Sequence, residues 1–138
     1  MPKKAKKSAD QPALKKVTAV LYVEEIEPCL DLWVNRLGFK KAMEVPEGSR
    51  LGFVGLTKGK FEVMYQTLES VAKDVPAFAS RAAGGTNLFI EVEDIDAIEK
   101  AVAGIPLAVP RRKTFYGSTE IGVKDPGGNV VLFAQMGG

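Results

Sequence analysis

The sequence predicts an α+β fold made of two tandem βαβββ modules, because a short motif and a whole order of elements each occur twice. The motif at residues 23–27, VEEIE, returns 69 residues later at residues 92–96 as VEDID. Each copy follows an apolar run typical of a strand and precedes apolar residues at helical spacing. Repetition of one supersecondary unit is stronger evidence for a fold than local propensity is.

The first predicted module runs from a strand through a helix to three further strands. Residues 17–23 alternate side chains with the two-residue period of a strand. Pro28 opens a segment whose apolar stripe includes Trp33 and Leu37, and Gly38 is suited to end this helix. The three following strands are predicted at residues 39–45, 51–57 and 61–67, with turns at residues 46–48 and 58–60.

The second predicted module repeats this order after a joint. Residues 68–76 are predicted to form a short helix or a loop, and residues 82–85 join the two modules. A strand at residues 87–92 precedes a helix whose apolar face carries Ile95 and Ile98. The last three strands are predicted at residues 107–112, 118–124 and 130–135, with a DPGGN turn at residues 125–129.

Length and composition bound the domain organisation. The 138 residues are 46% hydrophobic and 26% charged, as in a soluble globular protein of one domain. We expect a single domain at residues 17–136, in which residues 68–85 join modules at residues 17–67 and 86–136. Residues 1–16 are predicted to be a disordered, Lys-rich tail.

The net charge of +2 has its origin in this tail. Six of the nineteen basic residues lie there beside one acid, which leaves thirteen basic and sixteen acidic residues from Val17 onward, a net charge of −3. Because no basic face continues into the domain, we expect no nucleic-acid partner. No apolar run is long enough for a membrane segment, so we expect no membrane partner. The single cysteine, Cys29, cannot form an internal disulfide, and a cytoplasmic location is expected.

Alternation along the strands assigns side chains to two faces of each sheet. The set predicted to pack beneath the helices is Val17, Ala19, Leu21, Val23, Val63, Tyr65, Leu88, Ile90, Val92, Ile121 and Val123. The opposite face is predicted to carry Thr18, Val20, Tyr22, Phe53, Glu62, Met64, Gln66, Asn87, Phe89, Glu91, Glu120 and Leu132. Glutamates and aromatic rings mixed on one face predict a ligand cavity rather than a dry core.

Some aromatic and basic residues need separate interpretation. Trp33 lies on the apolar stripe of the first helix and is predicted to be a core residue. Phe115 and Tyr116 fall in a hairpin loop, where they are predicted to form a lid. The basic residues 111–113 beside them could catch an anionic group or be a solvated charge run. The predicted ligand-binding residues are Tyr22, Phe53, Glu62, Met64, Phe89, Glu91, Phe115, Tyr116 and Glu120.

Two motifs near the ends of the domain resemble those of a known superfamily. Residues 21–23 (LYV), Trp33 and residues 37–39 (LGF) resemble the opening motif of the vicinal-oxygen-chelate superfamily, which includes glyoxalase I, bleomycin-resistance proteins and extradiol dioxygenases. Residues 116–117 (YG) and 125–129 (DPGGN) are similar to its closing motif. The resemblance implies paired βαβββ modules that form a curved, open sheet around a cavity, commonly in a homodimer. The fold hosts unrelated activities.

The resemblance also implies where a metal ion would bind, and this chain departs from that pattern. Metal-dependent members take four ligands, mostly His and Glu, from the first and last strands of each module. The corresponding positions are Thr18, Glu62, Asn87 and Leu132, or Val131 if the alignment shifts by one residue. Only Glu62 is a usual ligand, and the chain has no histidine. We therefore expect no transition metal and no cofactor, with a Mg²⁺ or Ca²⁺ site at Glu62, Glu91 and Glu120 as the alternative.

These observations favour a metal-free small-molecule binding protein of the glyoxalase/bleomycin-resistance type. It would sequester a cationic or aromatic ligand in the groove between the modules. The alternative is an isomerase or lyase with a degenerate site, in which Glu62 is the catalytic base. A structural interpretation of Glu62 makes it a partner of Arg50 or a relic of the ancestral site. A structural or regulatory protein with a filled cavity is the third possibility.

Overall fold

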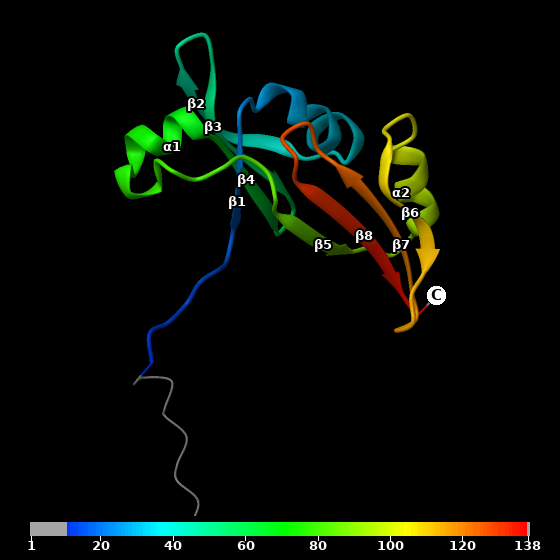
Figure 1. The fold of residues 1–138 in the computed structure, drawn as a ribbon. Helices are drawn as coiled ribbons and strands as arrows, with labels where there is room; N and C mark the ends of the chain where they lie inside the picture. Colours follow the sequence, from blue (N-terminus) through cyan, green and yellow to red (C-terminus); the bar gives the residue numbers. More distant parts are fainter. Residues whose placement is uncertain (1–10, 138) are drawn as a thin grey trace, which may run out of the picture.

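The computed structural model describes residues 11–137 and contains two four-stranded mixed sheets (Figure 1). The first sheet has the order β1-β4-β3-β2 and the second the order β5-β8-β7-β6. In each sheet the first strand runs parallel to the last, and the other neighbours are antiparallel. The strands are β1 (Ala19–Val23), β2 (Lys40–Glu47), β3 (Arg50–Lys58), β4 (Phe61–Thr67), β5 (Asn87–Glu91), β6 (Leu107–Lys113), β7 (Ser118–Lys124) and β8 (Val130–Met136). The same order in both sheets confirms the predicted α+β fold of two βαβββ modules.

Short helical segments connect these strands: η2 (Glu27–Cys29), η3 (Asp31–Arg36), α1 (Leu68–Asp74), η4 (Pro76–Phe78) and α2 (Ile95–Ala101). The first predicted helix is in fact a 3₁₀ turn followed by a π-helical turn. The N–H of Leu37 donates to the carbonyl of Leu32, 3.0 Å away and five residues back, which widens the turn and buries both Leu32 and Trp33. The joint begins with a helix capped by the hydroxyl of Thr67.

Most strand ends lie within one residue of the predictions, and two differ by two residues, the start of β1 and the end of β2. β1 begins at Ala19, so Val17 lies outside the sheet and is 94% exposed instead of packing beneath a helix. β2 continues through Pro46, where a turn was predicted, because this outer strand has no neighbour that needs the missing N–H. The turn falls at Gly48, which has a positive φ of 66°. Of the tail predicted at residues 1–16, residues 1–10 lie outside the described residues, and residues 11–16 are exposed and form no helix or strand. No helix among the described residues is long and apolar enough to span a membrane.

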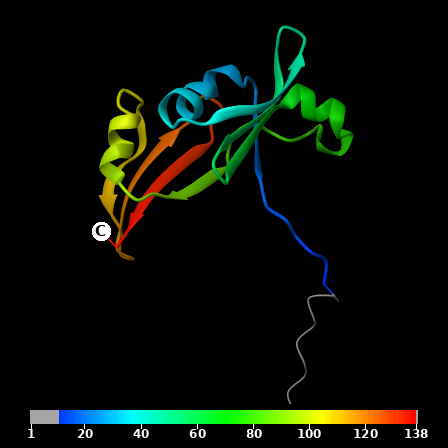
Figure 2. The ribbon, with the colours of Figure 1, turned by 180° about the vertical axis from the view of Figure 1, so that it is seen from behind.

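One hydrophobic core joins the two modules. Figures 1 and 2 both place the blue-to-cyan segment with η2 and η3 between the sheets, while α1 and α2 lie toward opposite ends. The buried cluster includes Leu21 and Tyr65 from the first sheet and Ile121 and Phe133 from the second. Trp33, 1% exposed, confirms the prediction of a core residue. The predicted helix-side parity is therefore correct for the buried centre of both sheets.

A buried polar chain also crosses between the modules. The indole N–H of Trp33 donates to the hydroxyl of Tyr65 at 2.9 Å, and that hydroxyl donates to the Asp125 carboxylate at 2.6 Å. The N–H of Asn129 donates to the other oxygen of the Asp125 carboxylate at 2.8 Å. Because Asp125 and Asn129 belong to the DPGGN turn, this motif holds the second module against the first.

Candidate ligand-binding site

A pocket of about 550 Å³ lies between the modules on the helix side of the strands. The first module contributes Trp33, Leu37 and Phe39 to its wall, and the second contributes Ile90 and Ile98. Most of the other wall residues are apolar or aromatic. A concave, mainly apolar site of this volume is the usual setting for a small-molecule ligand.

The position of the aromatic wall follows from local structure. Trp33 is fixed at its nitrogen by the hydroxyl of Tyr65, and its ring packs edge-on against Phe39 with 5.0 Å between ring centroids. Across the pocket, Leu88 and Ile90 belong to the wall and are more buried than their neighbours, because alternate residues of β5 share one face. The pocket therefore has one wall of rigid rings and one of branched aliphatic side chains.

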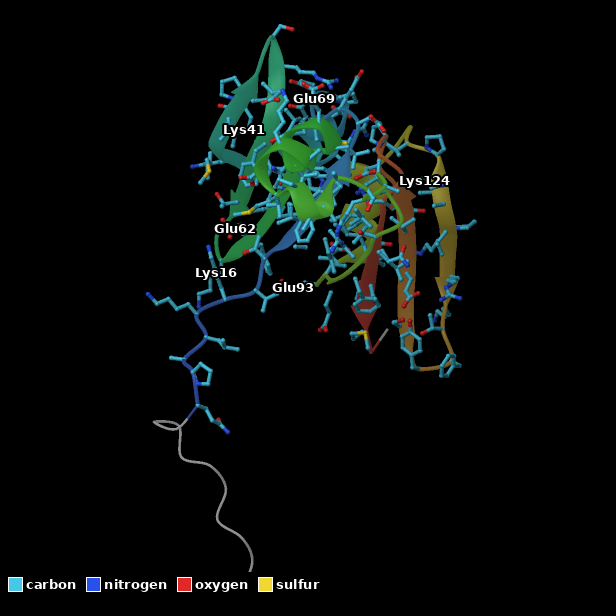
Figure 3. All side chains as sticks on the ribbon, turned by 60° about the vertical axis from the view of Figure 1, so that its left-hand side comes forward. Lys16, Lys41, Glu62, Glu69, Glu93 and Lys124 are labelled. Atoms are coloured by element: carbon cyan, nitrogen blue, oxygen red, sulfur yellow. The ribbon has the colours of Figure 1, made fainter. Side chains whose placement is uncertain are left out.

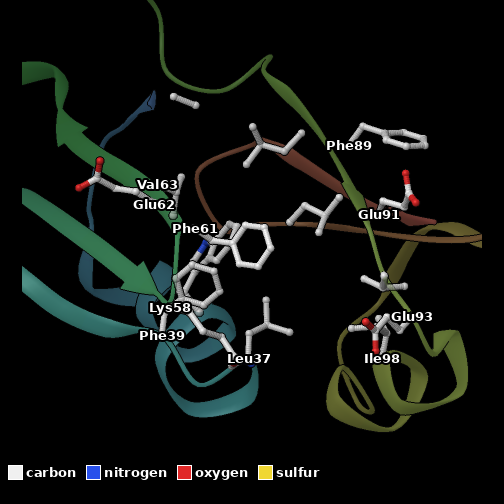
Figure 4. A pocket seen from close by; sticks show the side chains of 15 residues that line it. Leu37, Phe39, Lys58, Phe61, Glu62, Val63, Phe89, Glu91, Glu93 and Ile98 are labelled. Carbon is white, nitrogen blue, oxygen red and sulfur yellow. The ribbon is translucent and has the colours of Figure 1, made fainter. Parts of the chain in front are cut away.

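Several predicted ligand-binding residues flank this pocket but point away from it. Figure 4 shows Glu62 of the first module and Phe89 and Glu91 of the second with their side chains directed outward from the pocket interior. Their strands form the wall, and their side chains occupy the opposite face of each sheet, as the alternation predicted. Their role in ligand binding stays a prediction. The pocket offers a different binding surface, on the opposite face of the same strands.

Two neighbours contact the Glu62 carboxylate, and Figure 3 shows one of them, Lys16, beside it. Its carboxylate accepts a hydrogen bond from the Thr18 hydroxyl at 2.8 Å and contacts the Lys16 ammonium at 2.7 Å. The Lys16 hydrogen bond, followed by that of Thr18, lowers the pKa of Glu62 below its ordinary 4.5. A lowered pKa makes a carboxylate a weaker proton acceptor. The predicted partner Arg50 was wrong, because its guanidinium lies near Glu25 and Glu69 instead.

The outer face of the first sheet carries three more predicted residues. Tyr22 lies under the guanidinium of Arg81, 5.9 Å from the ring centroid. Met64 stands opposite Val20 on β1 and Gly55 on β3 in the strand register. Phe53 lines a separate, shallower pocket of about 410 Å³ beside α1. The structure therefore places Phe53 apart from the inter-module pocket.

The remaining predicted residues meet around Glu120 in the second module. Glu120 is 0% exposed, and its carboxylate accepts hydrogen bonds from Arg112, Ser118 and Tyr116. The Tyr116 hydroxyl is the largest influence that lowers the pKa of Glu120 below 4.5. Phe115 is fully exposed and packs edge-on against Tyr116 at 5.0 Å between centroids. Neighbours in the same hairpin therefore satisfy this carboxylate, and its role in ligand binding stays a prediction.

The donor set at the four metal positions does not fit a metal ion. Glu62 is bound to Thr18 and Lys16, and Leu132, opposite Phe89 in the register, has no donor atom. Within residues 11–137, no three His, Cys, Asp or Glu side chains gather closely enough to hold a metal ion.

The thiol of Cys29 is buried, and desolvation raises its pKa to about 12, so it is no nucleophile.

Two modules of one topology with an apolar pocket between them define an α+β fold of paired βαβββ modules. The family model described as Glyoxalase/Bleomycin resistance protein/Dioxygenase superfamily matches residues 15–133. The chain belongs to this superfamily. A comparison with curated proteins gives no match.

Solved structures with low sequence identity share the fold. A glyoxalase/bleomycin resistance protein/dioxygenase from Nocardioides has a TM-score of 0.71 at 17% identity, with 94% of this chain and 88% of that chain covered. TnmS3, an antibiotic binding protein from Streptomyces sp. CB03234, has a TM-score of 0.67 at 19% identity, with 91% and 99% covered. A lactoylglutathione lyase from Agrobacterium tumefaciens has a TM-score of 0.70 at 15% identity, with 91% and 96% covered. Both a binding protein and an enzyme carry this fold, so fold alone does not assign an activity.

Sequence reasoning missed most of the pocket wall. Val63, Leu88 and Ile90 were assigned to the layer beneath the helices, and all three line the pocket. Trp33 was correctly assigned to the core, but its place beside the pocket was not predicted. Leu88 and Ile90 are only half-buried, whereas Leu21 and Val23 of β1 are fully buried. The sequence carries no signal for this, because alternation assigns residues to two faces of a strand but does not show which face is left open by the packing of the modules.

Proposed function

We propose that this protein binds and sequesters an aromatic or cationic small molecule in the inter-module pocket, without a metal ion. The observation that carries the proposal is the pocket itself, about 550 Å³ in volume, with Trp33, Phe39 and Phe61 in its wall. Aromatic rings favour both stacked rings and cationic groups. The antibiotic-binding relative TnmS3 supports a binding function for this fold.

The rival proposal of an isomerase or lyase with Glu62 as base has less support from the geometry. Its carboxylate is paired with Lys16, and its pKa is lowered. A general base works best when its pKa is close to the working pH, which for a carboxylate means a raised value. Binding without turnover therefore agrees better with the described contacts.

The test compares two variants, one on the pocket face of the second sheet and one on the outer face of the first. Ile90→Phe fills the pocket, whereas Val20→Phe adds the same ring on the outer face near Met64. Binding of naphthylmethylamine and of related aromatic amines is followed by calorimetry and by the fluorescence of Trp33, the single tryptophan. We expect loss of binding in Ile90→Phe only. Loss in Val20→Phe only would move the site to the outer face, and no binding to the wild type would refute the proposal.

We also propose a homodimer that forms through the edge strands β1 and β5, because the other two edge strands are unsuited to pairing. The edge strands β2 and β6 carry Pro46 and Pro110, several basic residues and register irregularities, all of which discourage pairing with another chain. The edge strands β1 and β5 have no proline, no basic residue and an uninterrupted register. Light scattering after gel filtration should show a dimer that Val20→Lys weakens. A monomeric wild type would contradict this arrangement.

A further inference from the structure

Two residues of opposite charge face the inter-module pocket from different modules. Lys58, at the end of β3, lies on the side of Leu37 and Phe39, and Glu93, just after β5, lies on the side of Ile98 (Figure 4). Apolar side chains line the space between them. The pocket therefore has a cationic side, an apolar middle and an anionic side.

Neither charge is neutralised by the part of the chain that the structure describes. The Lys58 ammonium donates one hydrogen bond to the carbonyl of Leu37 at 2.6 Å and forms no ion pair with a described carboxylate. An ammonium group has three donors, so two are left for another acceptor. Glu93 likewise contacts no described Lys or Arg within 4.0 Å. The wall includes two further carboxylates. Glu62 is paired with Lys16, and the Glu91 side chain points away from the pocket interior (Figure 4).

From this arrangement we propose that the pocket selects an amphiphile with an acidic group at one end and a cationic group at the other, joined by an apolar body. Lys58 binds the acidic group, and Glu93 binds the cationic group. The inference rests on the proposed binding function and specifies its ligand class. Complementary charge at both ends fixes the orientation of the ligand and excludes analogues that place a like charge at either end.

The experiment uses four ligands with one chain length: ω-aminooctanoic acid, octylamine, octanoic acid and octanol. Their affinities are measured by calorimetry and by Trp33 fluorescence for the full-length protein. Because each exposed ionic contact contributes modestly, we expect the amino acid to bind about two- to fivefold more tightly than either singly charged analogue. This preference should shrink at high salt, since exposed charges are screened.

The variants Lys58→Met and Glu93→Gln identify the two ends. We expect Lys58→Met to remove the advantage of the amino acid over octylamine, and Glu93→Gln to remove its advantage over octanoic acid. The matched controls are Lys60→Met in the same hairpin and Glu24→Gln, the counterpart of Glu93 in the sequence repeat. Both controls should bind like the wild type.

The outcomes separate this inference from the proposed function. Equal binding of all four ligands, or equal loss in a variant and its control, overturns the charge selection while leaving an apolar or aromatic binding site. Preference for octylamine over the amino acid also overturns it. If none of these ligands and no aromatic amine binds to the wild type, the proposed function and this inference fail together.

Discussion

Removal of the Tyr65 hydroxyl should destabilise the protein strongly, because this group connects the two modules. Tyr65→Phe deletes the donor to Asp125, 2.6 Å away, and the acceptor for the Trp33 indole N–H, 2.9 Å away. All three side chains are buried. A lost hydrogen bond to a charged group costs about 1.5–3 kcal/mol, and an unsatisfied buried donor costs about 1–3 kcal/mol.

The two contributions share one hydroxyl group and overlap, so we expect a loss of about 2–4 kcal/mol in the free energy of unfolding. Asp125 retains the N–H of Asn129, which limits the loss. Urea unfolding followed by circular dichroism gives the free energy. The control is Tyr22→Phe, whose ring lies on the outer face of the first sheet. A loss below about 1 kcal/mol for Tyr65→Phe, or an equal loss for Tyr22→Phe, would refute the argument.

Three further predictions concern the two glycines of the outer faces, the buried thiol and the buried carboxylate. Gly122→Ala should cost about 1–3 kcal/mol in urea unfolding, since its Cβ would lie 2.9 Å from a side chain on the neighbouring strand. Gly55→Ala, with its nearest contact at 3.6 Å, should be close to neutral, and equal effects would contradict this. The pKa of Cys29, raised from 9.0 to about 12, favours the unfolded state as pH rises between these values, so Cys29→Ala should flatten the decline of stability there. Because the pKa of Glu120 is lowered, its carboxylate stabilises the folded state above pH 4.5, and this contribution is lost as pH falls through the folded-state pKa. Tyr116→Phe should raise the pKa of Glu120, as measured by carbon NMR titration. An unchanged pKa would exclude the Tyr116 contact.

The order of strands and helices could be predicted because its signals are local. Alternation along β4 and β7 matched the observed strands at both ends, since side chains in a strand must point to opposite faces. The repeat at residues 23–27 and 92–96 then implied one topology twice, and both sheets have it. The buried partners were harder, because Tyr65 and Asp125 are separated by 60 residues.

The sequence by itself determined the two modules and the buried centre of each sheet. Only the tertiary structure decided which face of the strands lines the pocket and which partner each charged side chain contacts. Glu62 was predicted to face a ligand or Arg50, but the nearby chain supplies Lys16. Lys58 and Glu93 carried no signal of their own, because the packing of one module against the other is what brings them to a single pocket. Periodicity sets which side of a strand a residue occupies, whereas the relative placement of two modules depends on contacts between distant residues.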